Sequence, residues 1–129
     1  MLFLELSIIW LSIVKKNKNI IILTGGTGGH IFPARCVAQE LANNNFNVTI
    51  CANKNYLKYS SYQDNFNYNI IAASAIKKNF ISLLFGVFLI FFGIIKSFFL
   101  ILFKRPAVII AFGGYATFPG LISAVLLRR

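Results

Sequence analysis

Two glycine-rich segments hold the residue types of this chain that are best suited to chemistry. The first reads GGTGGH over residues 25–30, and the second reads GGY over residues 113–115. Each follows a short apolar run and precedes a helical pattern, so each is predicted to be a turn between a strand and a helix. Glycine lacks a Cβ, which lets the backbone N–H groups at a helix start come close to a phosphate. We therefore expect phosphate or diphosphate binding here, with plain structural turns as the alternative.

His30 is the only histidine of the chain and directly follows the first group of glycines. A neutral imidazole at this place could take a proton from a sugar hydroxyl, which is general-base chemistry. The alternative is a helix-start residue that only hydrogen-bonds the loop. The residues alone leave both interpretations open.

Other kinds of site are disfavoured by the residues around these turns. Ile31 stands where a dinucleotide-binding fingerprint needs its third glycine, and no Lys-Ser or Lys-Thr pair follows the glycines as it does in a P-loop. Cys36 and Cys51 lack CxxC spacing and clustered histidines, so neither a metal site nor a redox motif is expected. We expect both cysteines to be buried, reduced thiols.

Apolar periodicity predicts the elements that must hold the two turns. Strands are expected at residues 20–23, 46–52, 69–73 and 107–111, helices at residues 30–43, 80–103 and 119–127, and a short helix and loop at residues 56–67. Strands that alternate with helices predict an α/β fold with a Rossmann-like parallel sheet. Because parallel strands end at one edge of a sheet, both glycine turns should border a single ligand site there.

Residues 80–103 form the most hydrophobic part of the chain. They exceed the roughly 20 residues that a helix needs to cross a bilayer. A span would place the flanking strands on opposite sides of the membrane, whereas a crossover helix keeps them parallel in one sheet. We therefore expect a helix with one face on the sheet and the other in the membrane surface, rather than a small membrane protein with chance glycine turns.

The start of the chain, residues 1–18, is predicted to be a hydrophobic and basic membrane-proximal extension ahead of a domain at residues 19–129. Its apolar part is followed, rather than preceded, by lysines, which is the wrong order for a cleaved signal peptide. An interfacial anchor fits better, and a misassigned start is the alternative. The net charge of +10 suits an anionic partner, but charge alone does not distinguish nucleic acid, an anionic leaflet and a diphosphate substrate.

Three strings of residues together resemble the MurG family of peptidoglycan N-acetylglucosaminyltransferases. They read GGTGGHIFPA over residues 25–34, AQEL over residues 38–41 and RPAVIIAFGGY over residues 105–115. The resemblance covers residues 19–129 and implies the amino-terminal half of a GT-B glycosyltransferase, which receives the lipid-linked acceptor. It also implies inverting transfer of N-acetylglucosamine from UDP-N-acetylglucosamine to undecaprenyl-diphospho-muramoylpentapeptide, with no metal and no separate cofactor.

Carried onto this chain, the resemblance makes His30 the candidate catalytic base. It assigns substrate contacts to the residues of the two turns, namely Gly25, Gly26, Thr27, Gly28, Gly29, Gly113, Gly114 and Tyr115. The expected partners are UDP-N-acetylglucosamine, the undecaprenyl-linked muramoyl-peptide and the membrane, and no nucleic acid. The expected location is peripheral, at the cytoplasmic side of the cell membrane.

Several features depart from the family pattern. The family continues into a donor domain, whereas this sequence stops at Arg129. Arg35 and Cys36 stand where the family usually has small apolar residues, and residues 118–120 replace a turn richer in serine and glycine. We therefore expect half an enzyme, inactive alone, that needs a separate donor-domain chain. The alternative is a non-catalytic membrane-bound remnant or a lipid-diphosphate-binding subunit.

Overall fold

A computed structural model describes residues 17–25, 27–59, 64–71 and 80–128, with residues 80–83 as backbone only. In chain order the elements are β1 (Asn19–Leu23), α2 (Gly28–Asn43), β2 (Asn47–Ala52), the 3₁₀ helix η1 (Lys54–Lys58), β3 (Asn67–Ile70), α3 (Phe80–Lys104), β4 (Val108–Ala111), the 3₁₀ helix η2 (Tyr115–Thr117) and α4 (Phe118–Leu126). All but the last two residues of the predicted extension 1–18 lie outside the described residues, so the extension stays a prediction.

The described strands form one parallel sheet in the order β3-β2-β1-β4. β1 lies between β2 and β4, and each of its residues from Ile20 to Leu23 is at most 4% exposed. A strand that is buried on both faces needs an apolar residue at every position, which explains the unbroken run that predicted it. The predicted α/β fold with a Rossmann-like parallel sheet is confirmed.

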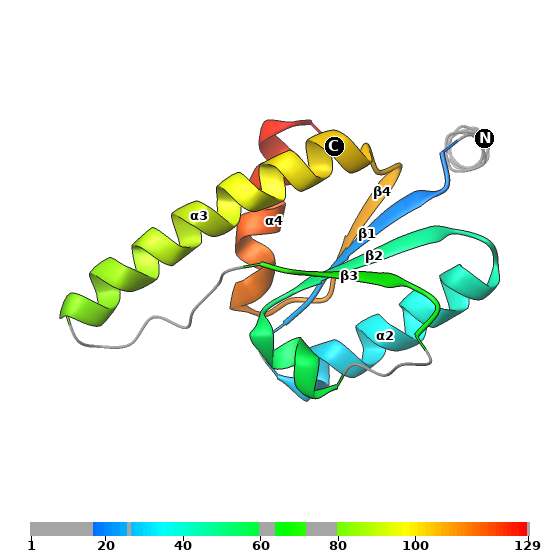
Figure 1. Ribbon diagram of the computed structural model, residues 1–129, viewed down its shortest axis with the longest axis horizontal. Helices are drawn as coiled ribbons and strands as arrows, with labels where there is room; N and C mark the ends of the chain where they lie inside the picture. Colours follow the sequence, from blue (N-terminus) through cyan, green and yellow to red (C-terminus); the bar gives the residue numbers. More distant parts are fainter. Residues whose placement is uncertain (1–16, 26, 60–63, 72–79, 129) are drawn as a thin grey trace, which may run out of the picture.

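Helices cover both faces of the sheet (Figure 1). α2 lies on one face, where its Ala34 shares a buried cluster with Ile22. α3 and α4 lie on the opposite face, where Ile101 and Ala124 share a second buried cluster with Leu23. Helices therefore cover both faces of the sheet, and a ligand could bind at the edge where the strands end.

The crossover helix α3 joins β3 to β4, as the parallel order requires. Its carboxyl-terminal half lies on the sheet, since Ile101 is 1% exposed and Lys96 Nζ donates to the carbonyl oxygen of Ile70 at 2.6 Å. Its amino-terminal half projects beyond the sheet (Figure 1). The prediction of one face on the sheet is therefore confirmed only for the carboxyl-terminal half. The physical reason is length, because 25 residues of helix at about 1.5 Å each are nearly twice as long as a six-residue strand at about 3.3 Å each.

Residues 84–104 of α3 are long and apolar enough to cross a membrane, judged by length and composition. Only 22% of the apolar window is buried within the protein. The segment nevertheless lies between two strands of one parallel sheet, which is the place of a crossover helix.

The two cysteines lie in different surroundings. Cys51 is buried in β2, and burial raises the pKa of its thiol to about 12. Cys36 is exposed, so the prediction that both thiols are buried is wrong for Cys36. The buried residues of α2 are Ile31, Ala34 and Ala38, and helical periodicity turns Cys36 away from them.

Candidate substrate site at the carboxyl edge of the sheet

The two glycine turns touch each other where β1 and β4 end. The two strands pair in parallel with Leu23 opposite Ala111, so both turns begin at the same level. A Cβ on Gly114 would lie well under 3.0 Å from the carbonyl oxygen of Gly25, and the φ of Gly114 is 88°. Only glycine fits such a place without strain. The predicted meeting of both turns at one sheet edge is confirmed.

The imidazole ring of His30 lies against the second glycine turn. A Cβ on Gly113 would lie 3.4 Å from His30 Cε1 and 3.5 Å from Nδ1, and one on Gly114 would lie 3.6 Å from Cδ2. The first turn holds the backbone of His30, because its N–H donates to Thr27 O at 3.1 Å and its carbonyl accepts from Thr24 Oγ1 at 3.0 Å. Within the described part of the chain the ring itself makes no hydrogen bond to the loop. The role of His30 as a base stays a prediction.

The amino end of α2 faces the same edge. Thr27 occupies the cap position but makes no capping hydrogen bond with its side chain, and the first turn contains no acidic residue. The first N–H groups of a helix have no partner within it, so those of Gly28 and Gly29 and the positive end of the helix dipole are available to an anion. Gly26 lies outside the described residues, and its predicted contact stays a prediction.

Asn53 directly follows β2 and belongs to this site, although the sequence reasoning missed it. Its Nδ2 donates to the hydroxyl oxygen of Tyr115 at 2.8 Å, and the residue is only 4% exposed. Gly25 leaves room for this arrangement, because a Cβ on Gly25 would lie 3.3 Å from Asn53 Oδ1 and 2.5 Å from the Cβ of Ala116. One feature of the sequence could have indicated Asn53: it is a polar residue just after a predicted strand, at the edge where α/β sheets bind ligands.

Hydrogen bonds close the second turn, and the helix after it packs tightly on β1. Thr117 closes the turn, since its Oγ1 donates to the carbonyl oxygen of Gly114 at 2.8 Å and its N–H donates to the same oxygen at 3.1 Å. Gly120 lets α4 pack closely on the end of β1, because a Cβ there would lie 2.6 Å from Leu23 Cδ2. Tyr115, at the start of η2, remains 40% exposed. The predicted Gly114 and Tyr115 therefore stand at the site in a fixed turn.

Arg35 ties α2 to the segment that follows η1. Its Nη2 lies 2.6 Å from Asp64 Oδ1, and its Nη1 donates to the carbonyl oxygen of Tyr59. Tyr59 packs edge-to-face on Phe32, with ring centroids 5.3 Å apart. The Phe32 ring borders the first turn, where a Cβ on Gly28 would lie 3.2 Å from it. Arg35 thus has a structural role at a position where a small residue was expected.

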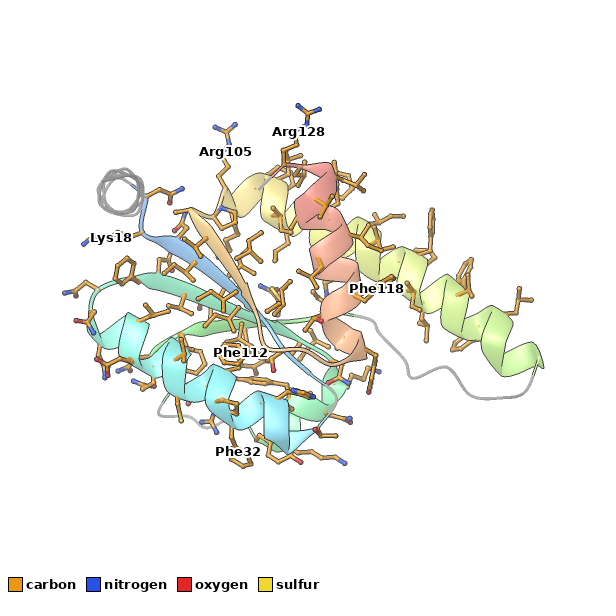
Figure 2. The ribbon with its side chains drawn as sticks, turned by 180° about the vertical axis from the view of Figure 1, so that it is seen from behind. Lys18, Phe32, Arg105, Phe112, Phe118 and Arg128 are labelled. Carbon is orange, nitrogen blue, oxygen red and sulfur yellow. The ribbon has the colours of Figure 1, made fainter. Side chains whose placement is uncertain are left out.

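In the part of the chain that the structure describes, three basic side chains lie far from the glycine turns and two lie nearer to them. Lys18, Arg105 and Arg128 lie at the end of the molecule where the strands begin (Figure 2). Lys54 and Lys58, in η1 directly after β2, are nearer the site. Among the described residues no group of three His, Cys, Asp or Glu side chains could hold a metal ion.

The sheet, its helical layers and the two turns at one edge define the class of protein as the amino-terminal half of a GT-B glycosyltransferase. The solved structure of Acinetobacter baumannii MurG has the same fold, with a TM-score of 0.69 over 84% of this chain and 32% of that chain, at 23% identity. Residues 20–129 match the glycosyltransferase family 28 N-terminal domain. The chain belongs to glycosyltransferase family 28 through this amino-terminal domain.

Similar curated proteins carry the name UDP-N-acetylglucosamine--N-acetylmuramyl-(pentapeptide) pyrophosphoryl-undecaprenol N-acetylglucosamine transferase. One from Protochlamydia amoebophila is 38% identical over 115 residues, and one from Francisella tularensis subsp. tularensis is 36% identical over 114 residues. The aligned parts cover 87% and 88% of this chain but only 31% of each relative. The predicted resemblance to the MurG family is confirmed, and the chain spans about a third of the length of these relatives.

Proposed function

We propose that this chain is the acceptor-side half of an inverting glycosyltransferase of peptidoglycan synthesis. The reaction moves N-acetylglucosamine from UDP-N-acetylglucosamine to undecaprenyl-diphospho-muramoylpentapeptide. The observation that carries the proposal is the contact between the two glycine turns, with the ring of His30 packed on the second turn. The names of the relatives, which describe N-acetylglucosamine transfer to a pyrophosphoryl-undecaprenol acceptor, support the choice of substrates.

His30 supplies the base in this proposal. Its imidazole accepts the proton of the acceptor hydroxyl while the hydroxyl oxygen attacks the anomeric carbon of the donor sugar from the face opposite the diphosphate. The bond from the anomeric carbon to the diphosphate oxygen breaks, and UDP leaves with the bonding electron pair. The N–H groups of Gly28 and Gly29 and the hydroxyl of Tyr115 bind the diphosphate of the lipid-linked acceptor and so hold its sugar hydroxyl near His30.

The donor nucleotide needs more protein than this chain supplies. The chain spans only 31% of its relatives, so we assign most UDP-N-acetylglucosamine binding to a donor domain outside these 129 residues. The acceptor half alone is then inactive.

We place the chain peripherally on the cytoplasmic side of the cell membrane, and an exposed apolar face supports the membrane contact. α3 runs antiparallel to the strands, so its amino-terminal half projects past the edge that bears the glycine turns (Figure 1). The apolar face consists of the exposed α3 side chains Leu84, Phe85, Val87, Phe88, Phe91 and Phe92. On α4, Phe118, Leu121 and Val125 are exposed as well. Exposed apolar patches mark membrane or partner surfaces, and insertion of this one would bring the site next to the lipid headgroups.

Reconstitution with a donor domain tests the proposal. The chain is mixed with the donor domain of the Protochlamydia amoebophila relative and membranes, and labelled N-acetylglucosamine is followed into the lipid fraction. We expect transfer with both parts, none with either part alone, and a loss of about a hundredfold or more for His30→Ala. Asn67→Ala, an exposed site at the opposite edge of the sheet, serves as the matched control and should transfer normally. No transfer from two parts that co-purify would contradict the proposal.

A non-catalytic lipid-diphosphate-binding subunit or membrane-bound remnant is the second candidate. The two glycine turns and the exposed apolar face fit it as well, because neither diphosphate binding nor membrane contact requires sugar transfer. In that case His30→Ala would leave diphosphate binding unchanged, and the mixed parts would transfer no sugar.

A further inference from the structure

We propose that Asn53 is a positioning residue that fixes the hydroxyl of Tyr115 as a hydrogen-bond donor to an oxygen of the acceptor's diphosphate. The inference rests on the proposed function, since it adds a residue to the part of the site that holds the diphosphate. It concerns a side chain outside both glycine turns.

The amide of Asn53 links the ends of three neighbouring strands. Asn53 follows β2, lies beside Gly25 at the end of β1, and reaches Tyr115 beyond β4. Its Nδ2 meets the hydroxyl oxygen of Tyr115 at 2.8 Å, although the two residues are 62 positions apart in sequence. The bond therefore fixes the Tyr115 hydroxyl relative to the first glycine turn.

The direction of this hydrogen bond determines what Tyr115 offers to a ligand. The amide N–H donates and the phenolic oxygen accepts, so Asn53 does not use the phenolic proton. Tyr115 as a residue is 40% exposed, whereas Asn53 is 4% exposed, so the phenolic proton remains for an acceptor other than Asn53. An anionic phosphate oxygen is the kind of acceptor that forms a short, strong bond with such a donor.

The side-chain oxygen of Asn53 indicates that packing alone does not explain an asparagine at this position. Asn53 Oδ1 is buried and has no hydrogen-bond partner among the described residues. An unpaired buried acceptor is unfavourable, and an apolar side chain of similar size would fill the same space without it. What the amide adds is the N–H donor to Tyr115.

Variants of the two residues separate this role from a merely structural one. Isothermal titration calorimetry with inorganic diphosphate, on the full chain in lipid nanodiscs, gives the dissociation constant. The variants are Asn53→Ala, Asn53→Asp, Tyr115→Phe and the two double variants. Aspartate has the shape of asparagine but only acceptor atoms when ionised, so the bond must reverse and draw the phenolic proton inward. The Tyr115→Phe background measures the effect of the added charge alone, and thermal unfolding of each variant reports structural damage.

We expect Asn53→Ala and Tyr115→Phe each to weaken diphosphate binding by about tenfold. Asn53→Asp should weaken diphosphate binding more than Asn53→Ala does. Its effect should be larger when Tyr115 is present than in the Tyr115→Phe background. In the Tyr115→Phe background, Asn53→Ala should have no additional effect, because both changes remove the same interaction. Should Asn53→Ala fail to fold, Asn53→Asp, which conserves the side-chain volume, decides the question.

Unchanged affinity of Asn53→Ala, or fully additive losses in the double variant, would overturn the positioning role while the proposed function stands. A lower unfolding temperature without a change in affinity would overturn it in the same way. A wild-type chain with no measurable affinity for diphosphate would contradict both proposals.

Discussion

The α-carbon of Gly114 rests against the carbonyl oxygen of Gly25, so the turn after β4 sits directly on the turn after β1. A parallel sheet brings the two strand ends to one edge, but this contact also requires that neither turn carries a side chain at these places. The N–H groups of both turns can therefore bind one shared ligand.

Substitution of Gly114 by alanine should disrupt this contact. We expect Gly114→Ala to lower the free energy of unfolding by about 2 kcal/mol or more, because a φ of 88° is strained for alanine and the new Cβ meets backbone. Urea unfolding measures the change. Gly86→Ala in α3 is the matched control, since no atom lies within 4 Å of its Cβ position, and it should stabilise the helix by up to about 1 kcal/mol. Equal stability of Gly114→Ala and wild type would mean that the turns do not touch.

The two cysteines should differ sharply in reactivity. Burial raises the pKa of the Cys51 thiol to about 12, so at pH 8 it has almost no thiolate and little access to a reagent, whereas Cys36 is exposed. We expect a maleimide to label one thiol of the folded chain and both thiols of the denatured chain. The folded Cys36→Ser variant should carry no label. Mass spectrometry counts the labels. Labelling of both thiols at similar rates in the folded chain would contradict the burial of β2.

Removal of Arg35 should loosen the wall beside the first turn. We expect Arg35→Ala to destabilise the chain by about 2 kcal/mol, because Asp64 is 10% exposed and loses its charged partner. Arg35→Lys keeps the charge but not the planar fork, so it should recover only part of the loss. Chemical unfolding compares the three proteins, and an Arg35→Ala variant as stable as wild type would show that the ion pair contributes nothing.

The apolar face should govern membrane binding. We expect replacement of Phe85, Phe88 and Phe91 by serine to weaken binding to anionic vesicles by about a hundredfold, because each exposed ring loses the benefit of burial in lipid. Sedimentation with vesicles measures the partition. Leu57→Ser, an exposed apolar residue of η1, is the control and should bind as wild type does. A triple variant that still binds fully would remove the support for this surface as the membrane contact.

Local patterns in the sequence were sufficient to predict elements whose burial is uniform along their length. β1 is buried on both faces, so its apolar run predicted its existence, and its bounds to within one residue. β3 begins at Asn67 rather than near residue 69, because its polar edge-strand residues carry little pattern. α2 begins at Gly28 rather than near residue 30, because the glycines form its first turn.

The candidate site could be predicted only in part, since some of its members are defined by tertiary contacts. The two turns were predictable because glycines after parallel strands must share an edge. Asn53 was missed because nothing near it in sequence indicates a bond to Tyr115. The exposure of Cys36 likewise depends on which side of α2 meets the sheet.

The most direct test of the shared site is a titration of the ¹⁵N-labelled chain with inorganic diphosphate, followed by amide chemical shifts. The predicted result is that the N–H signals of Gly28 and Gly29 and those of Gly114 and Tyr115 move together and saturate with one dissociation constant. Signals that move in only one turn, or with two unrelated dissociation constants, would contradict a single anion site formed by both turns.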